Sequence, residues 1–190
     1  MTKHKPGTIR IIGGHWRRHL LHFPDVPGLR PTHDRIRETL FNWLMPYIKG
    51  ARCLDLFAGS GALGFEALSR DAEAVSFVDS HTKVVDYIKQ TAISLGVESD
   101  TFEVILGRCP EQSIPLHFKP YDIVFLDPPY KDHRMAQILA WLEKNECLSD
   151  EALIYMEMEK QREPIQFDGW KILKEGHTKT ISYFLFSRGV

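Results

Sequence analysis

Short hydrophobic runs alternate with longer amphipathic segments along most of the chain. The short runs predict β-strands, and the segments whose apolar residues recur every three or four positions predict α-helices. Strands are expected at residues 53–57, 74–78, 102–106, 121–126, 152–158, 170–175 and 180–187. Helices are expected between several of them, at residues 62–69, 81–95 and 135–145. Repeated strand–helix units predict an α/β fold with a doubly wound, mostly parallel, seven-stranded sheet, in which the last two strands form an antiparallel edge.

The N-terminal part of the chain has a different pattern. Residues 8–12 and 15–22 predict the two strands of a β-hairpin around Gly13 and Gly14. A connector rich in Pro and Gly follows at residues 23–31, and Thr32 is the expected N-cap of a helix. The apolar stripe of that helix comprises Ile36, Leu40, Trp43, Leu44 and Tyr47. We expect residues 1–31 to form the hairpin and connector, and residues 32–190 to form the α/β domain with its N-terminal helix, in one compact unit.

The composition is that of an ordinary globular protein. Of 190 residues, 43% are hydrophobic and 26% are charged, and no apolar run approaches the roughly 20 residues of a membrane span. The N-terminus lacks the pattern of a secretory signal, and three widely spaced cysteines favour neither disulfides nor a zinc motif. His15, His19 and His22 lie in a predicted hairpin without accompanying Cys or Asp, so no metal site is expected. We expect a cytoplasmic protein, with a monomer as the default.

The net charge of −1 hides a basic N-terminal segment. Residues 1–37 contain eight basic and two acidic residues, a net charge of +6, whereas the remaining 16 basic and 23 acidic residues give −7. A cationic segment on an acidic body favours a polyanionic partner. In the predicted hairpin, Arg10, Arg17 and Arg18 alternate with apolar residues such as Trp16, as a nucleic-acid-binding surface requires. A solvated extension without a partner is the alternative.

A glycine loop follows the first predicted strand of the sheet. Gly59 and Gly61 allow a tight turn that a ligand can approach closely, and Gly64 lets the next helix pack on a strand. Asp79, about 20 residues after the first glycine, ends the next strand, where a carboxylate can bind ribose hydroxyls. The spacing also fits the NAD-binding fingerprint, but Asp55 disfavours a pyrophosphate and favours a cationic amino-acid group. The loop therefore predicts S-adenosylmethionine as the cofactor, with NAD as the alternative.

A second motif, Asp127-Pro128-Pro129-Tyr130, follows the predicted buried strand at residues 121–126. The two prolines fix the backbone, so acceptor groups can bind the hydrogens of an amine while the aromatic ring stacks on a flat base. In doubly wound sheets, ligands bind at the carboxyl ends of strands where the strand order reverses. We therefore expect Asp127 to face a methyl donor held by the glycine loop, for chemistry on an exocyclic amine.

Strings near the N-terminus are similar to those of a known family. They are Arg10-Ile-Ile-Gly-Gly14, Trp16-Arg17-Arg18 and Arg30-Pro-Thr-His-Asp-Arg-Ile-Arg-Glu-Thr-Leu-Phe-Asn42. Together with the two core motifs, they resemble the RsmD family of bacterial 16S rRNA guanine-N2 methyltransferases over nearly the whole chain. The resemblance implies a class I, Rossmann-like methyltransferase sheet that transfers a methyl group from S-adenosylmethionine to guanine N2. The implied partner is 16S rRNA in the assembled or assembling small ribosomal subunit.

The resemblance also implies roles for individual residues. In the family, the turn with two prolines binds the target amine, so the Asp127 carboxylate and the Pro128 carbonyl would accept its hydrogens. Pro129 would stiffen this turn, and Tyr130 would stack on the base. The implied cofactor-binding residues are Asp55, Phe57, Gly59, Gly61, Asp79, Thr32, Arg35 and Glu38, of which the last three would line the methionine end. The implied RNA-binding residues are Arg10, Trp16, Arg17 and Arg18.

Some positions allow two interpretations. Trp16 can stack on a base or pack the hairpin on the body, and Arg37 can line the cofactor site or only decorate a helix face. Near Gly107, where the family usually has an Asp that binds adenine, this chain has Arg108, which cannot accept a hydrogen bond. Backbone groups or Glu111 are the alternative adenine contacts. The alternative functions are methylation of adenine N6 or of a glutamine side chain, NAD-dependent oxidoreduction, and RNA binding or assembly without catalysis.

Overall fold

The structure is a computed structural model that describes residues 7–24, 26, 33–128, 134–160 and 166–189 of the chain. Its elements in chain order are β1 (Gly7–Arg10), β2 (Leu20–Phe23), α1 (Asp34–Trp43), β3 (Arg52–Asp55), α2 (Ala62–Ser69), β4 (Ala74–Asp79), α3 (Thr82–Leu95), β5 (Phe102–Leu106), β6 (Tyr121–Leu126), α4 (Met135–Lys144), β7 (Leu148–Glu159), β8 (Trp170–His177) and β9 (Ile181–Arg188). Within these ranges, no helix is long and apolar enough to cross a membrane. Nor do three His, Cys, Asp or Glu side chains of the described residues come together as metal ligands.

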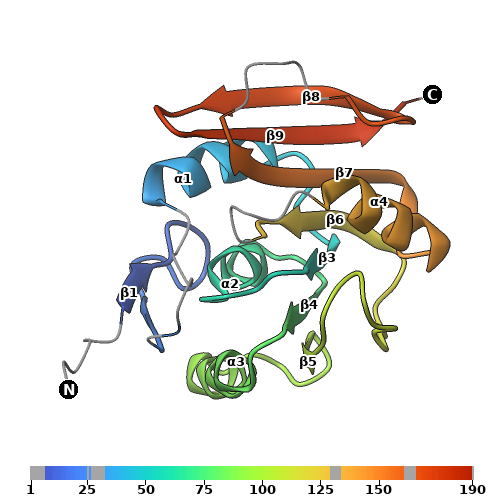
Figure 1. The fold of residues 1–190 in the computed structure, drawn as a ribbon. Coiled ribbons are helices and arrows are strands. Elements are labelled where there is room, and N and C mark those ends of the chain that lie inside the picture. The colour runs from blue at the N-terminus through green and yellow to red at the C-terminus, as the bar shows by residue number, and fades with distance from the viewer. Residues whose placement is uncertain (1–6, 25, 27–32, 129–133, 161–165, 190) are drawn as a thin grey trace.

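Seven strands form one sheet in the order β5-β4-β3-β6-β7-β9-β8 (Figure 1). The first five strands in this order, from β5 through β4, β3 and β6 to β7, are parallel, and β9 is antiparallel to both of its neighbours. Along the sheet the chain proceeds from β3 to β5 in one direction and from β6 onward in the other, so the order reverses between β3 and β6. These two strands pair there, with Asp55 opposite Phe125. The predicted doubly wound, mostly parallel seven-stranded sheet with an antiparallel edge is confirmed.

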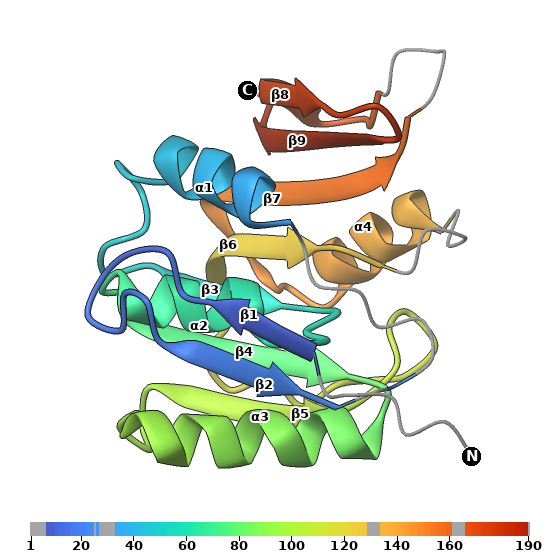
Figure 2. The same cartoon turned by 90° about the vertical axis from the view of Figure 1, so that its left-hand side faces the viewer.

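Helices cover both faces of the sheet. The helices α1, α2 and α3 pack on one face beside the hairpin, and α4 packs on the other (Figures 1 and 2). On the first face, the rings of Phe41 and Phe125 have centroids 6.0 Å apart, and those of Phe65 and Phe77 are 4.9 Å apart. On the second face, α4 contributes Ile138 to a separate core. Burial on both faces explains why the central strands are continuous apolar runs in the sequence.

Several element boundaries differ from those predicted. Strand β3 ends at Asp55 rather than at residue 57, because the chain then turns toward β4, where the Ala58 N–H donates to the Val78 carbonyl at 2.9 Å. Strand β7 starts at residue 148, earlier than expected. The N-cap of α1 is His33, so the predicted cap at Thr32 is wrong, and the helix ends at Trp43 before the Tyr47 of the predicted stripe.

The N-terminal hairpin has shorter strands and a longer loop than predicted. Gly7 pairs with Phe23 and Arg10 with Leu20, and residues 11–19 form the loop between the strands. The prediction of strand at residues 15–19 is therefore wrong. Arg18 and His19 still bond to Ile11 across the hairpin, but the residues before them turn to α2: the His15 N–H donates to the Ser69 carbonyl at 2.7 Å.

Candidate active site

The reversal of strand order places two of the predicted motifs side by side. Asp55 is the last residue of β3, and Asp127 directly follows β6. Because these strands are parallel and paired, both residues lie at the carboxyl edge of the sheet. The Leu56 N–H donates to the Phe125 carbonyl at 3.2 Å, which keeps the start of the glycine loop beside the end of β6. The structure therefore brings the predicted cofactor loop and the predicted catalytic turn together.

The glycine loop is held by the carboxylates that end β3 and β4. The Gly59 N–H donates to Asp79 Oδ2 and the Gly64 N–H to Asp55 Oδ2, both at 3.0 Å. Gly59 has a φ of 51°, in the left-handed region that the predicted tight turn requires. A β-carbon on Gly64 would lie 2.2 Å from the ring of Phe77, so the predicted close packing of helix on strand is confirmed.

Asp55 is a buried carboxyl group, with 2% of its surface exposed. Burial is the largest cause that raises its pKa from 3.8 to about 7; the charges of Asp127 and Asp79 raise it further, and the N–H of Gly64 opposes the rise. A cation beside this carboxylate would stabilise its charged form. The ammonium group of an amino-acid ligand is such a cation. Asp55 therefore fits the amino-acid end of S-adenosylmethionine.

Asp79 ends β4 beside the same loop. Its Oδ1 accepts the His81 N–H at 2.8 Å, while its other oxygen binds the Gly59 N–H. Burial raises the pKa of Asp79, and these N–H donors lower it. Its carboxylate retains acceptor capacity for hydroxyl donors, which fits the predicted contact with ribose. In the same loop, Phe57 packs half-buried on the second core, and Gly61 (φ 71°) is the N-cap of α2 without a side-chain cap bond.

The catalytic turn lies only partly within the described residues. Asp127 is half-buried and Pro128 is buried. Pro129 and Tyr130 lie outside the described ranges, so the stacking role of Tyr130 stays a prediction from the sequence. Asp127 nevertheless has a defined setting, because it follows a strand whose residues are fully buried at its carboxyl end.

A buried polar pair on β7 lies next to this turn. Tyr155 is opposite Phe125 in the sheet, and its hydroxyl donates to Glu157 Oε1 at 2.7 Å. Burial raises the pKa of Tyr155 well above its usual value, and the charges of Glu157 and Asp127 raise it further. The charge of Asp127 therefore raises the pKa of a residue on each neighbouring strand, Asp55 on β3 and Tyr155 on β7. The sequence analysis missed Glu157, although it is the one acid within the apolar run predicted as a strand at residues 152–158.

Four residues in or before α1 were considered for the cofactor site: Thr32, Arg35 and Glu38 as predicted contacts, and Arg37 as one of two interpretations. Arg35 and Glu38 are exposed, and Thr32 lies outside the described ranges. Arg37 is fully buried, and its Nη2 donates to the main-chain carbonyl of Arg10 at 2.8 Å. The interpretation of Arg37 as decoration of an exposed helix face is therefore wrong. It connects α1 with the hairpin.

The position near Gly107, where the family usually has an adenine-binding Asp, has no carboxylate of its own. The Gly107 N–H donates to the Asp79 carbonyl at 3.0 Å, and Arg108 is exposed. Glu111, the alternative acceptor, is already paired with Arg134, whose hydrogen bond is the largest cause that lowers the pKa of Glu111. A contact from Glu111 to adenine would have to compete with that pair. Main-chain groups after β5 are the simpler candidates.

The predicted RNA-binding residues lie away from the carboxyl edge. Arg10, Arg17 and Arg18 are exposed, whereas Trp16 is half-buried against the first core, which favours its packing interpretation. The arrowheads of β4 and β6 point to one side of Figure 2, and the blue loop between β1 and β2 lies at the other. The structure therefore does not bring residues 16–18 together with the catalytic turn, and Arg10 is the last residue of β1, directly before that loop.

Two polar residues of α2 were missed by the sequence analysis. All eight residues of this helix are buried, including Glu66 and Ser69. Glu66 accepts hydrogen bonds from the main-chain N–H groups of Ile12 and Gly13 at 2.7 and 2.8 Å. A single acid within an otherwise apolar helix was the available signal, because such a residue needs a buried partner.

Comparisons with known proteins identify the family of the chain. A family model described as Conserved hypothetical protein 95 matches residues 9–187. Ribosomal RNA small subunit methyltransferase D of Haemophilus influenzae is 44% identical over 97% of this chain and 96% of its own length. The protein of the same name from Escherichia coli strain K12 is 41% identical over 96% of this chain and 91% of its own length. The chain belongs to the RsmD family.

The solved structures place this RsmD-family chain among methyltransferases by fold as well. The Escherichia coli protein yhhF, described as a methyltransferase, is 40% identical, covers 96% of this chain and 98% of its own, and has a TM-score of 0.83. The predicted methyltransferase fold is thereby confirmed. RsmD-family enzymes are methyltransferases that use S-adenosylmethionine, so the cofactor prediction is confirmed at the level of the family and the NAD alternative is set aside.

Proposed function

We propose that the protein transfers a methyl group from S-adenosylmethionine to the N2 amine of a guanine in 16S rRNA of the assembled or assembling small ribosomal subunit. One observation carries the proposal: Asp55 and Asp127 lie at the carboxyl ends of paired strands, on the two sides of the strand-order reversal. The first suits a cationic methyl donor and the second suits an amine. The names of the relatives support rRNA as the substrate.

The chain contributes to this reaction mainly by positioning the two reactants. S-adenosylmethionine, when bound, supplies the methyl group as an electrophile. The Asp127 carboxylate and the Pro128 carbonyl accept hydrogen bonds from the two amine N–H groups. These bonds turn the nitrogen lone pair out of conjugation and toward the methyl carbon. The bound cofactor would exchange its S–CH3 bond for a C–N bond to the amine, and the Asp127 carboxylate is the adjacent acceptor for the proton that the amine loses. The second product is S-adenosylhomocysteine.

Radiolabelled methyl transfer to small subunits that lack the modification tests the proposal. We expect the wild-type protein to label 16S rRNA, and Asp127→Ala to lower the rate by about 100-fold or more, because a charged group that orients the reacting amine is lost. The matched control is Asp86→Asn, which changes an exposed aspartate of α3 and should keep the wild-type rate. Calorimetric titration with S-adenosylhomocysteine checks that Asp127→Ala retains its cofactor site.

Nucleoside analysis of the labelled RNA separates the remaining alternatives. Label in N2-methylguanosine supports the proposal, whereas label in N6-methyladenosine would replace guanine by adenine as the target. A wild-type protein that binds S-adenosylhomocysteine but labels no RNA would overturn it. Unchanged labelling by Asp127→Ala would leave the substrate in place and refute the mechanism.

A further inference from the structure

The loop between β1 and β2 is bound to α2 through a buried carboxylate. Glu66 has no exposed surface, and its Oε2 accepts the Ile12 N–H at 2.7 Å while its Oε1 accepts the Gly13 N–H at 2.8 Å. Arg70 Nε also donates to Oε1, at 2.8 Å. Two consecutive main-chain N–H groups of the loop therefore donate to one buried side chain. Bonds to a charged acceptor are stronger than neutral ones, so this contact fixes the loop backbone.

Ser69 holds the same loop on the next turn of the helix. Its hydroxyl donates to the Gly13 carbonyl at 2.7 Å and accepts the Trp16 N–H at 2.9 Å, and its carbonyl accepts the His15 N–H at 2.7 Å. A β-carbon on Gly14, which has a φ of 75°, would lie 1.6 Å from the Ser69 carbonyl oxygen. Only glycine permits this approach of loop to helix.

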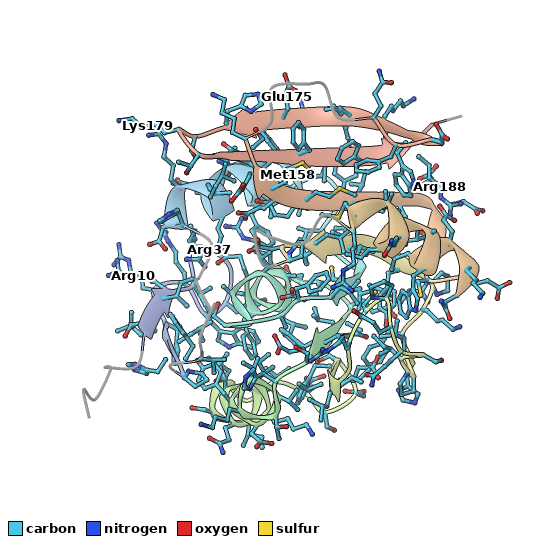
Figure 3. All side chains as sticks on the ribbon, viewed as in Figure 1. Arg10, Arg37, Met158, Glu175, Lys179 and Arg188 are labelled. Carbon is cyan, nitrogen blue, oxygen red and sulfur yellow. The ribbon has the colours of Figure 1, made fainter. Side chains whose placement is uncertain are left out.

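A buried arginine holds the hairpin from its other side. Arg37 of α1 donates from Nη2 to the Arg10 carbonyl at 2.8 Å and to Asp34 Oδ1 at 2.7 Å. Figure 3 labels Arg37 and Arg10 on the same side of the molecule. Its Nη1 lies 3.9 Å from Glu66 Oε2, and both side chains are fully buried. The hairpin is thus fixed where β1 ends, by α1, and in its loop, by α2. Opposite buried charges of the two helices meet beneath it.

This arrangement sets the distance between the basic loop and the catalytic turn. Helix α2 starts at the glycine loop, which lies beside the catalytic turn, and ends at Ser69, which contacts the loop between β1 and β2. Its eight residues separate the glycine loop from that contact by about 12 Å along the helix. Arg17 and Arg18 are exposed in the loop so held. Arg18 has a φ of 73°, a conformation that costs about 1–2 kcal/mol for a residue other than glycine. The contacts with α2 therefore maintain a strained backbone in the segment that carries the charges.

We propose that Glu66 is a positioning residue, which holds Arg17 and Arg18 at a fixed offset from the catalytic turn so that they bind rRNA backbone phosphates remote from the target base. The inference rests on the proposed function. Guanidinium groups suit phosphate oxygens, and a loop that is already ordered loses little conformational entropy when it binds. The enzyme then contacts its substrate at two edges of the sheet, and Glu66 acts on binding without touching RNA, cofactor or the reacting atoms.

Steady-state kinetics with unmethylated small subunits tests this role in a double-mutant cycle. The variants are Glu66→Gln, the double variant Arg17→Gln/Arg18→Gln, and the two combined. We expect Glu66→Gln to raise KM about tenfold, with kcat and the affinity for S-adenosylhomocysteine unchanged. In the background without the two arginines, Glu66→Gln should raise KM no further, because it has no charges left to position. A general loss of structure would instead lower kcat and cofactor affinity in both backgrounds.

Two further variants keep the test sharp. Glu66→Gln leaves Arg37 and Arg70 without the counter-charge of Glu66. Ser69→Ala is the milder variant, because it removes two loop contacts without a change of charge. It should raise KM about threefold. Glu103→Gln is the matched control, since Glu103 bonds to Ser76 and His117, which are not residues of the hairpin or of α2. Its KM should equal that of the wild type.

The outcomes separate the inference from the proposed function. A wild-type KM in both Glu66→Gln and Ser69→Ala would overturn the inference, and so would an effect that persists without Arg17 and Arg18. If the wild-type protein methylates no subunits, the proposed function fails, and the cycle is then measured as equilibrium binding to the subunits. Non-additive losses of binding would still support the positioning role, and additive losses would contradict it.

Discussion

The two edges of the sheet differ in how their residues are brought together. At the carboxyl edge, Asp55, Asp79 and Asp127 end strands or follow them directly, and the parallel sheet alone makes them neighbours. At the opposite edge, where the parallel strands begin and which we call the amino edge, the loop of residues 11–19 is positioned by side chains of α2. These side chains lie more than 50 residues away in the sequence. The proposed chemistry therefore depends on the regular part of the fold, whereas the proposed contact with RNA depends on a few long-range polar bonds.

This difference predicts separate consequences for the two edges. A change at the carboxyl edge should alter cofactor binding or the chemical step and leave RNA affinity intact. A change at the amino edge should alter RNA affinity and leave the cofactor site intact. Variants that violated this separation would show that the two edges act as one site.

The largest effect is expected from Asp55→Asn. Loss of the carboxylate should weaken S-adenosylhomocysteine binding by about 100-fold or more, because the ammonium group loses a buried counter-charge. Isothermal titration at pH 8 measures this. The same variant should keep the wild-type affinity for small subunits. A cofactor affinity within threefold of the wild type would show that Asp55 does not hold the ammonium group.

The same substitution should weaken cofactor binding but make the ligand-free protein relatively more stable at higher pH, because the pKa of Asp55 is raised. Its folded-state pKa of about 7 lies above the unfolded value near 3.8, so the protonated carboxyl stabilises the ligand-free protein at low pH. This contribution is fully present below about pH 4 and is lost as the pH rises from there through about 7. The stability of Asp55→Asn relative to the wild type should therefore be greater at pH 8 than at pH 4, by about 1–3 kcal/mol. Urea unfolding at the two pH values checks this, with Asp86→Asn as the control.

The same contrast explains how much the sequence could predict. The strands, the doubly wound sheet and the neighbourhood of Asp55 and Asp127 follow from apolar runs and from the rule that parallel strands share a carboxyl edge. The long hairpin loop, the buried Arg37 and the role of Glu66 could not be predicted, because local patterns do not show which distant group accepts a loop N–H. Periodicity predicted strand at residues 15–19, but bonds to α2 took precedence over it.

A smaller effect is expected when the charges of the loop are removed. Arg17→Gln/Arg18→Gln should weaken binding to small subunits about tenfold at moderate salt and reduce the slope of log affinity against log salt by about 2, one for each lost phosphate contact. Binding across a salt series measures both quantities. Cofactor affinity and thermal stability should not change. An unaltered salt slope would show that the loop does not contact the RNA backbone.

The smallest effect separates strain from charge within the same loop. Arg18→Gly should stabilise the protein by about 0.5–1 kcal/mol, because glycine adopts the φ of 73° without steric cost. Arg17→Gly is the matched control: it removes the same charge from the neighbouring residue, which has no positive φ, and should destabilise the protein slightly. Each variant should lower the salt slope by about one. If Arg18→Gly gains stability but loses RNA affinity, the loop retains a strained arginine for binding and not for folding; equal stability of the two glycine variants would contradict the strain.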